Sequence, residues 1–534
     1  MSLTQTLSIH NFDGLKNDLK RIVGTEHVLS GSEELDFYSS DTFDQKVLAE
    51  LIVQPGTPED VAAAVGLCTG AGYAVIPRGG GLSYTGGYLP IRDHSVIFDL
   101  TRLTRILEIN AEDMYVTVEA GVTWHRLYEA LMPLGLRTPY WGTVSGYHAT
   151  IGGGLSQGST HFGSGEFGPS GESCLGLDVA VADGRIITTG SSATAHRASP
   201  FFRGYGPDLT GLFLNDTGAL GFKVRATLKL IKAPPHQRYA SVAFETLEQQ
   251  MGAMAEVSRN RLASECGGWD PALVRRFGSA DTAIQEDLKY LSGVVRSGSS
   301  LLGGVLDAAK IAIAGRRAWQ DNVFLMHVTT DEFSAAAADE KAKAVEKIAA
   351  SFGGRMIPAT YPRAHRARPF TDMTAQPRIE ERTVPTHGIC PHSRTVEMAK
   401  NVYGIFDEHA ALMERHGITW SLISSTLGNN ATLVEPLIYY VDKRGAHFDR
   451  IPKPGKLPPR YGDADPVTIE ALRTIRRALA QMFMKNGCVH LQIGKSYPYK
   501  EGRAPETWAL LKSIKDSVDP KGLINPGSLG LGSE

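Results

Sequence analysis

The stretch "VIPRGGGLSYTGGYLP", residues 75–90, places five glycines between two apolar runs, and three of them are consecutive. Glycine loses more conformational entropy on folding than any other residue, so a cluster inside an ordered domain needs a local reason. One such reason is a turn that requires positive φ, and another is a ligand that touches the backbone itself. Backbone N–H groups in a glycine turn can converge on an anion, and the missing Cβ atoms let a phosphate approach closely. The stretch is therefore a candidate phosphate loop, and a tight turn without a ligand is the alternative.

This loop follows neither of two common nucleotide-binding motifs. Tyr84 stands where the third glycine of GxGxxG belongs, and no helical pattern follows at once. The tripeptide "GKS" at residues 494–496 has Val489 in place of the first glycine of a Walker A loop. A different kind of phosphate loop is indicated.

Two further glycine-rich stretches follow, "HATIGGGLSQGSTHFGSGEFG" (residues 148–168) and "FLNDTGALGFKVRATLKL" (residues 213–230). The first contains a GxSxG pattern that would make Ser156 the nucleophile of a serine hydrolase. That motif needs a strand before the serine and a helix after it, whereas glycines lead in here. Its small polar side chains suit a long, flat ligand lying along the main chain instead. In the second stretch, Gly218 and Gly221 mark a turn that enters an alternating strand.

Composition describes a globular enzyme. The 534 residues are 42% hydrophobic and 21% charged with a net charge of −2, which gives no reason to expect nucleic acid or an anionic membrane surface as a partner. The five cysteines are scattered without a CxxC pair, which argues against a disulfide framework and a thiolate zinc site. The N-terminus lacks the features of a signal peptide and no apolar run is long enough to span a membrane, so we expect a cytoplasmic protein.

The order of elements changes along the chain. Residues 50–78 read as strand, turn, helix and strand, with Thr57 as the helix N-cap and Pro58 in its first turn. Short strands continue to about residue 235, after which helices alternate with extended pieces. The two prolines of "IKAPPHQ" lie at this change and mark a domain boundary.

Five segments together resemble a known family. They are "PRGGGLSYTGG" (residues 77–87), "TIGG" (150–153), "GLDVAVADG" (176–184), "TGALGFKVRATLKL" (217–230) and "IKDSVDPKGLINPG" (514–527). In this order they resemble the FAD-binding domain of the vanillyl alcohol oxidase and p-cresol methylhydroxylase flavoproteins. The resemblance implies an α+β fold: an FAD-binding domain of two subdomains, an α+β cap that supplies most of the substrate site, and a C-terminal tail that returns to the flavin domain. We expect residues 1–235 to form the FAD-binding domain with its N-terminal helical segment, residues 236–480 the cap and residues 481–534 the returning segment.

The resemblance also implies which residues bind FAD. These are Pro77, Arg78, Gly79, Gly80, Gly81, Leu82, Ser83, Tyr84, Thr85, Gly86, Thr150, Gly152, Gly153, Ser156, Gly158, His161, Gly218, Gly221, Val224 and Asn525. The berberine-bridge-like branch attaches FAD through a histidine of the first glycine loop, where this chain has Gly80 and Gly81. We therefore expect non-covalent FAD, with a link through Tyr439 or Tyr440 as the alternative.

The candidates for catalysis are fewer. His490 falls where the phenol-oxidising branch carries a histidine near the flavin, and an imidazole titrates near working pH, so it is the first candidate base. The further candidates are His387, His392, Tyr84 and Tyr497.

Three positions depart from the phenol-oxidising branch. Gly487 and Cys488 replace its phenolate-binding Tyr–Arg pair, Pro169 lies where its catalytic aspartate belongs, and residues 433–434 lie where its flavin-linked histidine belongs. The histidine-rich metal motif of the 2-hydroxy-acid branch has no match either, so we expect no metal.

The sequence therefore predicts an FAD-dependent oxidoreductase that oxidises an alcohol or a phenolic side chain by hydride transfer to flavin N5. A 2-hydroxy-acid dehydrogenase of the D-lactate or glycolate type, and redox-neutral flavin chemistry, remain open alternatives. Expected partners are a small-molecule substrate and O2 or another electron acceptor, and a homodimer is compatible with the family. Arg363, Arg366 and Arg368 could hold a substrate carboxylate, with a solvated surface loop as the alternative.

Overall fold

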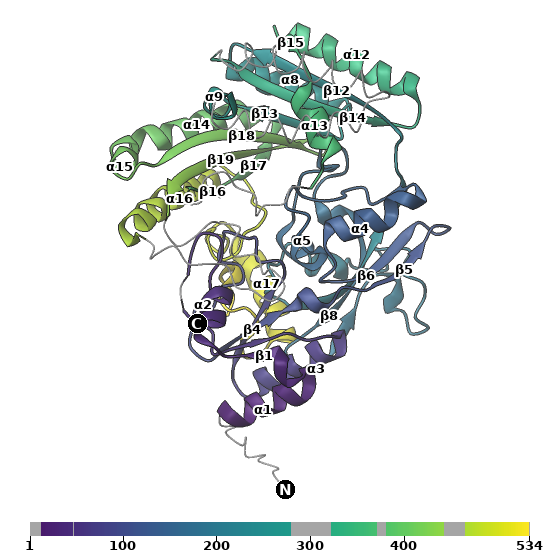
Figure 1. Ribbon diagram of the computed structural model, residues 1–534, viewed down its shortest axis with the longest axis vertical. Helices are drawn as coiled ribbons and strands as arrows, with labels where there is room; N and C mark the ends of the chain where they lie inside the picture. The colour runs from purple at the N-terminus through teal and green to yellow at the C-terminus, as the bar shows by residue number, and fades with distance from the viewer. Residues whose placement is uncertain (1–11, 46, 279–321, 371–380, 443–464, 533–534) are drawn as a thin grey trace.

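The computed structural model describes residues 12–45, 47–278, 322–370, 381–442 and 465–532 of the chain. The N-terminal residues 1–11, on which the signal-peptide expectation rests, lie outside this set. Figure 1 shows two lobes: a lower one with the N-terminal half of the chain and an upper one built on a large sheet. The C-terminal segment, drawn in yellow, runs from the upper lobe back into the lower one. Helices and strands both contribute to each lobe, as an α+β fold requires.

The lower lobe contains two main sheets and a short ribbon. The first sheet has the order β1 (Val28–Leu29), β2 (Leu51–Val53), β4 (Ser95–Asp99) and β3 (Ala74–Arg78), with β2, β4 and β3 parallel. The second is antiparallel, in the order β5 (Ile106–Asn110), β6 (Tyr115–Glu119), β10 (Phe222–Lys229), β8 (Cys174–Ala180) and β9 (Ile186–Thr188). The short strands β7 (Leu136–Arg137) and β11 (Ile231–Lys232) pair separately.

Seven short helices accompany these sheets in the described residues. They are α1 (Phe12–Val23), α2 (Ser32–Tyr38), α3 (Pro58–Gly70), α4 (Trp124–Leu131), α5 (Ile151–Gln157), α6 (Ser164–Phe167) and α7 (Leu209–Leu212). Helix α3 begins as the sequence predicts: Thr57 Oγ1 accepts from the Asp60 N–H and the Asp60 carboxylate accepts from the Thr57 N–H. Its apolar face packs with α1 over the first sheet.

The upper lobe, which we call the cap, is built on an eight-stranded sheet. Its order is β15 (Arg355–Ile357), β12 (His236–Phe244), β14 (Phe324–Glu332), β13 (Glu265–Trp269), β18 (Thr419–Leu427), β19 (Ala431–Val441) and β16 (Glu381–Pro385), and β17 (Gly388–Pro391) also pairs with β19. Its helices are α8 (Leu247–Arg259), α9 (Pro271–Gly278), α12 (Ala335–Ser351), α13 (Thr360–Ala367), α14 (Thr395–Glu408), α15 (Ala410–Arg415) and α16 (Pro466–Lys485). The cap sheet begins at His236, directly after the prolines that suggested a boundary.

The C-terminal segment connects the two lobes. Helix α16 packs Leu472, Ile475 and Phe483 into the core of the cap, so the expected boundary at residue 480 falls within this helix. Residues after it, including Ile493 and Leu529, belong to the core around the second sheet. Helix α17 (Pro505–Val518) lies between these two residues in the sequence. The division of the chain into 1–235, 236–480 and 481–534 stays our proposal.

The tail is fixed to the first glycine loop by Asn525. Its backbone N–H donates to the Val75 carbonyl at 2.8 Å, which places the tail beside β3. Its side-chain Nδ2 donates to the carbonyls of Gly87 and Thr217, both at 2.8 Å, and its Oδ1 accepts from Lys495 Nζ at 2.8 Å. One fully buried amide thus joins the first glycine loop, the third glycine stretch and the C-terminal segment.

Replacing Asn525 by alanine should therefore destabilise the protein. The change leaves two buried carbonyls and a lysine without these partners, and each such loss costs about 1–3 kcal/mol. We expect the urea midpoint to fall by an amount equivalent to about 2–4 kcal/mol. Asn430→Ala, in the exposed turn between β18 and β19, is the matched control and should stay within about 0.5 kcal/mol. Equal midpoints for both variants would contradict this role.

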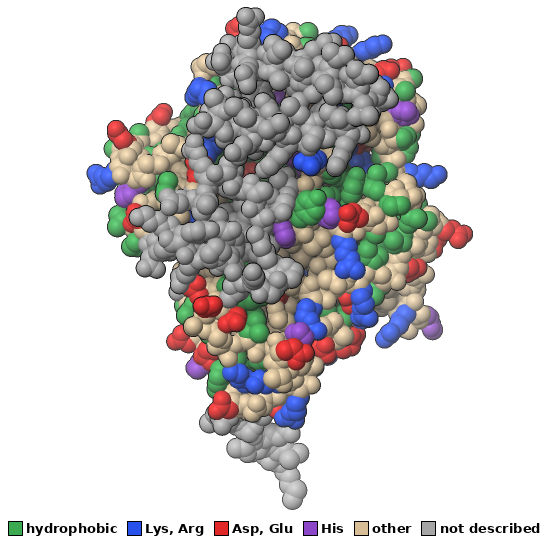
Figure 2. Space-filling view, viewed as in Figure 1, with side chains coloured by type: hydrophobic (Ala, Val, Ile, Leu, Met, Phe, Trp, Pro, Cys, Tyr) green, Lys and Arg blue, Asp and Glu red, His purple; other side chains and the backbone are tan. Residues whose placement is uncertain are grey.

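Charges of both signs are interspersed on the surface. Figure 2 shows blue and red side chains mixed over the lower lobe on the face drawn, as the net charge of −2 suggests. Among the residues that the structure describes, no helix has the length and apolar character needed to cross a membrane.

Candidate functional site

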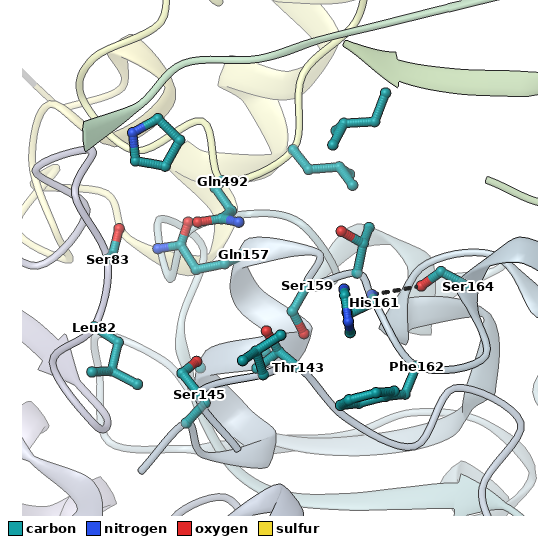
Figure 3. Close-up of a pocket in the computed structure, with 18 of the residues that line it drawn as sticks. Leu82, Ser83, Thr143, Ser145, Gln157, Ser159, His161, Phe162, Ser164 and Gln492 are labelled. Atoms are coloured by element: carbon teal, nitrogen blue, oxygen red, sulfur yellow. Dashed lines mark hydrogen bonds between the residues drawn. The ribbon is translucent and has the colours of Figure 1, made fainter. Parts of the chain in front are cut away.

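A cavity of about 470 Å³ lies where the two lobes meet. The lower lobe contributes the first glycine loop, helix α5 with the residues before it, and the turn that leads into β10. The cap contributes residues of β13, β14, β18, β19 and α13, and the C-terminal segment contributes Leu491 and Gln492. Figure 3 shows Leu82, Ser83 and Ser145 on one side of this space and His161 and Phe162 on another, with Gln157 and Gln492 close together. All three glycine-rich stretches therefore border one cavity.

The consecutive glycines allow two loops to touch. A Cβ on Gly80 would lie 2.0 Å from the His148 carbonyl oxygen, and Gly81 has φ of +71° with the Arg78 guanidinium only 2.3 Å from where its Cβ would be. At both positions a side chain would therefore clash with the protein itself, whether or not a ligand is bound. Within the described residues, the N–H groups of residues 80–83 donate no hydrogen bond to the protein. The loop thus offers free donors to an anion in the cavity.

The second glycine stretch forms a helix, which the sequence analysis did not foresee. Thr150 caps α5 by accepting from the Gly153 N–H at 3.2 Å, and Gly158 ends it with φ of +69°. Ser156 lies within this helix and borders the cavity. The strand–serine–helix turn of a hydrolase is therefore absent around Ser156, and the ligand-binding main chain expected here is instead largely hydrogen-bonded within α5.

The structure places the expected cofactor-binding residues in two groups. Those that border the cavity are Pro77, Gly79, Gly80, Gly81, Leu82, Ser83, Tyr84, Thr150, Gly152, Gly153, Ser156, His161, Gly218 and Gly221. Those outside its lining are Arg78, Thr85, Gly86, Gly158, Val224 and Asn525. Residues 143–145 also border the cavity and were missed, although "GTVSG" carries the same small polar signature as the stretches that were recognised.

Arg78 lies beneath the glycine loop. Its side chain is 1% exposed and its guanidinium stands over the rings of Phe37, Tyr38 and Tyr88 at 4.7–5.3 Å. None of its three side-chain nitrogens has a hydrogen-bond acceptor among the described residues. A buried positive charge of this kind stabilises negative charge nearby.

The expected catalytic residues are only partly brought together. His387 borders the cavity; its Nε2 accepts from the Leu491 N–H at 3.0 Å, so its proton lies on Nδ1, 3.2 Å from the Tyr497 hydroxyl. His490 donates from Nδ1 to the His387 carbonyl at 2.8 Å and is not among the lining residues. His392 also lies outside the lining, with its two nitrogens bonded to Thr432 and Ser258. Burial lowers the pKa of His387 to about 3 and that of His490 to about 4, which makes both imidazoles neutral at pH 7.

Glu435 is the functional candidate that sequence reasoning missed. It lies on β19, borders the cavity, and has a carboxylate oxygen 3.8 Å from His387 Nδ1. Burial raises its pKa to about 7, and a hydrogen bond with Tyr84 acts in the opposite direction. A carboxyl group of this kind can take up a proton near neutral pH. The signal in the sequence was a single acidic residue inside the apolar strand "TLVEPLIYY".

The cap end of the cavity is lined by rings. We call it the ring chamber: His161, Trp269, His327, Tyr361 and His365. Tyr361 stacks on His365 at 5.3 Å and meets Trp269 edge-on at 4.4 Å. The Nε2 atoms of His161 and His365 are 2.6 Å apart, and His327 Nδ1 is 2.8 Å from the Ser241 hydroxyl.

Burial keeps these imidazoles neutral. It lowers the pKa of His161 to about 4 and that of His327 to about 3, and it holds the pKa of His365 well below its usual value. His327 Nε2 has no hydrogen-bond partner among the described residues. The chamber therefore offers aromatic faces and a neutral hydrogen-bonding nitrogen.

The cations that border the cavity are paired with carboxylates. Arg366 binds Glu265 at 2.5 Å and also Asp331, and Lys223 binds Asp216 at 2.5 Å. Arg366 and Lys223 are the only lysine or arginine side chains among the described lining residues. Arg363 and Arg368, by contrast, are exposed. Neither lining cation is thus left for a substrate carboxylate. The described residues also contain no cluster of three histidine, cysteine, aspartate or glutamate side chains that could hold a metal ion.

Comparison with known proteins identifies two regions of the chain. The model of the FAD binding domain matches residues 49–190, and the model of the C-terminal domain of FAD linked oxidases matches residues 493–529. Curated relatives include D-lactate dehydrogenase [cytochrome] 1, mitochondrial, of Saccharomyces cerevisiae, 26% identical over 46% of this chain and 42% of that protein. The glycolate oxidase subunit GlcD of Bacillus subtilis is 25% identical over 46% of this chain and 50% of that protein. The chain thus aligns with half or less of the length of these relatives.

Solved structures share the fold over the whole chain. A 4-ethylphenol oxidase from Gulosibacter chungangensis superposes with a TM-score of 0.70 at 16% identity, covering 99% of both chains. p-Cresol methylhydroxylase gives 0.70 at 16% identity, covering 97% of this chain and 96% of that one. An alkyldihydroxyacetonephosphate synthase gives 0.65 at 16% identity, with 97% and 85% covered. These structures confirm the α+β fold expected from the sequence, and the model that matches residues 49–190 confirms the FAD-binding domain.

The residues of the cavity fit the FAD that this domain binds. The free N–H groups of residues 80–83 suit diphosphate oxygens, and the unpaired guanidinium of Arg78 lies beneath them. Gly153 also borders the cavity, and a Cβ there would meet only the Thr150 hydroxyl, at 3.0 Å. Packing within the protein therefore does not require glycine at position 153, whereas a ligand in the cavity next to its Cα would.

Proposed function

From the FAD-binding domain and the FAD-linked oxidase C-terminal domain that the chain carries, we propose that this protein is an FAD-dependent oxidoreductase that oxidises an uncharged alcohol or phenolic side chain. The observation that carries the proposal is Glu435, a cavity-lining carboxyl whose pKa burial raises to about 7. FAD, when bound, supplies the hydride acceptor, N5 of its ring. The protein must then take the proton of the substrate hydroxyl.

Three side chains have a part in this proton transfer, and only Glu435 accepts the proton. The Glu435 carboxylate accepts it, and its pKa near 7 lets it return the proton to water after each turnover. Tyr84, whose pKa burial raises far above its usual value, stays protonated and orients the carboxylate through their hydrogen bond. His387 is neutral and fixed by Leu491, so it orients groups around Glu435 without competing for the proton. His490 stays a candidate base one layer behind His387.

The ring chamber supports an uncharged substrate. An aromatic or apolar group gains by burial against Trp269 and Tyr361, and a hydroxyl can satisfy His327 Nε2 in either tautomer. A carboxylate would be buried there without a free cation, which is costly.

A 2-hydroxy-acid dehydrogenase is the second candidate. It is favoured by the curated relatives, which include D-lactate dehydrogenases and glycolate oxidase subunits at 25–28% identity. It requires Arg366 to exchange Glu265 or Asp331 for the substrate carboxylate. Redox-neutral chemistry is a third, which rests on the fold shared with alkyldihydroxyacetonephosphate synthase.

Anaerobic reduction of the bound flavin tests the proposal and separates the candidates. Benzyl alcohol, 4-hydroxybenzyl alcohol, 4-(hydroxymethyl)benzoate and D-lactate are mixed in turn with the holoprotein, and absorbance near 450 nm is followed. We expect bleaching by the two uncharged alcohols and slower or no bleaching by the two carboxylates. Reduction by D-lactate alone would support the second candidate, and no reduction by any substrate would contradict oxidoreductase function for these classes.

Acid precipitation of the holoprotein tests how FAD is held. We expect the flavin absorbance in the supernatant, because the first loop has Gly80 and Gly81 where a linking histidine would be. Tyr439 and Tyr440 lie outside the cavity lining, and the Tyr439 hydroxyl is bonded to Ser421 at 2.9 Å. Flavin retained in the pellet would instead show a covalent link, which peptide mapping would locate.

A further inference from the structure

Cys390 and Cys488 occupy directly opposite positions on two paired segments. Ile389, on β17, and Val489, in the C-terminal segment, form an antiparallel bridge and exchange both backbone hydrogen bonds, at 2.8 and 3.0 Å. In antiparallel pairing, one residue forward on one segment faces one residue back on the other. Cys390 therefore faces Cys488.

This register places the two cysteines at a disulfide-compatible position. A pair that follows a hydrogen-bonded pair is a non-hydrogen-bonded one, in which Cα atoms are about 4.5 Å apart. Disulfides span Cα separations of roughly 4.4–6.8 Å, so this spacing needs little backbone movement. The two thiols are close enough to affect each other's ionisation, and both residues are buried, at 3% and 8% exposure.

The surroundings favour reaction of one of the two sulfurs. The neighbouring Cys488 thiol lowers the pKa of the Cys390 thiol, and the charge of Arg394 acts in the same direction. The pKa of Cys488 is raised by the neighbouring Cys390 and by burial. Cys390 is thus the nucleophile and Cys488 the resolving thiol.

We propose that Cys390 and Cys488 are a site of reversible oxidation that forms a disulfide between cap strand β17 and the C-terminal segment. The oxidant is hydrogen peroxide. The Cys390 thiolate attacks one peroxide oxygen and the O–O bond breaks, giving a sulfenic acid and, with one proton, water. The Cys488 sulfur then attacks the sulfenic sulfur, the S–S bond forms and a second water leaves. Two thiols lose two electrons, and one peroxide is reduced to two waters.

The disulfide would reinforce contacts beside the cavity. These contacts are made two and three residues after Cys488 in the chain. His490 Nδ1 donates to the His387 carbonyl, and the Leu491 N–H donates to His387 Nε2. Leu491 and Gln492 border the cavity. The covalent bond would therefore hold the C-terminal segment against the cap at the edge of the site, and it would resist separation of the two.

Treatment of the FAD-loaded protein with hydrogen peroxide tests the site without relying on the proposed function. We expect the intact mass to fall by about 2 Da, a Cys390–Cys488 linked peptide after digestion without reductant, and a higher melting temperature, all reversed by dithiothreitol. Cys68, Cys174 and Cys266 are internal controls: each is a buried free thiol with a raised pKa. They should stay unmodified.

Two variants sharpen the outcome. Cys488→Ser should give a stable sulfenic or higher oxide on Cys390 and no cross-link, whereas Cys390→Ser should leave Cys488 unmodified at the same peroxide dose. Stepwise oxygen addition to the wild-type thiols without a cross-linked peptide would overturn the proposal. So would a cross-link that involves other cysteines, or equal reactivity of Cys390 and Cys266. The wild-type peptide map alone decides the matter if either variant fails to fold.

Discussion

Replacing Gly80 by alanine should remove FAD from the purified protein. The new Cβ would lie 2.0 Å from the His148 carbonyl oxygen and 2.8 Å from its carbon, and neither is a side-chain atom that can rotate away. The first glycine loop and residues 148–150 must then separate, which disperses the free N–H groups of residues 80–83. We expect the ratio of absorbance at 450 nm to that at 280 nm to fall by more than about tenfold, because several charge-assisted hydrogen bonds are lost together.

Two other glycines serve as controls for this result. Gly404, on α14, has nothing within 4 Å of an added Cβ, so Gly404→Ala should keep its FAD. Gly153→Ala should fold normally, since its Cβ meets little protein, but should bind FAD more weakly because that Cβ enters the cavity. Full flavin content in Gly80→Ala, with an unchanged circular dichroism spectrum, would contradict the importance of this contact.

The parts of the fold that follow from local rules could be predicted. Thr57 and Asp60 cap α3 because their side chains act on neighbouring N–H groups, and such reciprocal caps are visible in sequence. The first glycine loop was found for a similar reason, because it lies between two apolar runs that become β3 and β4. The order of the five segments that resemble the family, more than any one of them, indicated the FAD-binding domain.

Helix α5 shows where local propensity misleads. Its residues "IGGGLSQ" include three glycines, which are poor helix formers, so the sequence predicted a main chain open to a ligand and no helix. Tertiary packing decides otherwise: a Cβ on Gly152 would lie 2.7 Å from the Ala120 Cβ, and one on Gly154 would lie 2.8 Å from Trp124 Nε1. The glycines let the helix lie against Ala120, which directly follows β6, and against Trp124 of α4, and this close packing outweighs their low propensity.

The chemistry of the site depended on contacts between distant residues. Arg366 looked available for a carboxylate because Glu265 and Asp331, its partners, lie 101 and 35 positions away. Glu435 looked like any residue of a cap strand, since its raised pKa comes from burial in the assembled cavity. The pairs of Arg366 form only when distant elements of the cap pack together, and the pKa of Glu435 rises only when the cap lies against the lower lobe. Local sequence patterns report neither kind of contact.

Replacing Glu435 by glutamine should slow reduction of the bound flavin by about 10²–10⁴-fold, which is the usual contribution of a general base. Gln has the shape of Glu but cannot accept the substrate proton. In the wild-type protein the rate should rise with pH through about 7, since the ionised carboxylate is the active form. This rise should be absent in Glu435→Gln. Anaerobic stopped-flow reduction across pH 5–9 measures both effects, with Glu408→Gln on the exposed face of α14 as control.

Stability should change in the opposite direction, which separates a catalytic role from a structural one. Folding raises the pKa of Glu435 from 4.5 to about 7, so the folded state disfavours the ionised form. Its effect on stability is therefore neutral below about pH 4.5, becomes increasingly unfavourable between about pH 4.5 and 7, and stays constant above that range. Glu435→Gln removes this cost and should melt at a higher temperature than wild type at pH 8, with no such gain at pH 4. A side chain that lowers stability at working pH and is needed for rate is placed there for chemistry. A variant that is destabilised at pH 8 and keeps the pH-dependent rate would contradict this role and return attention to His490.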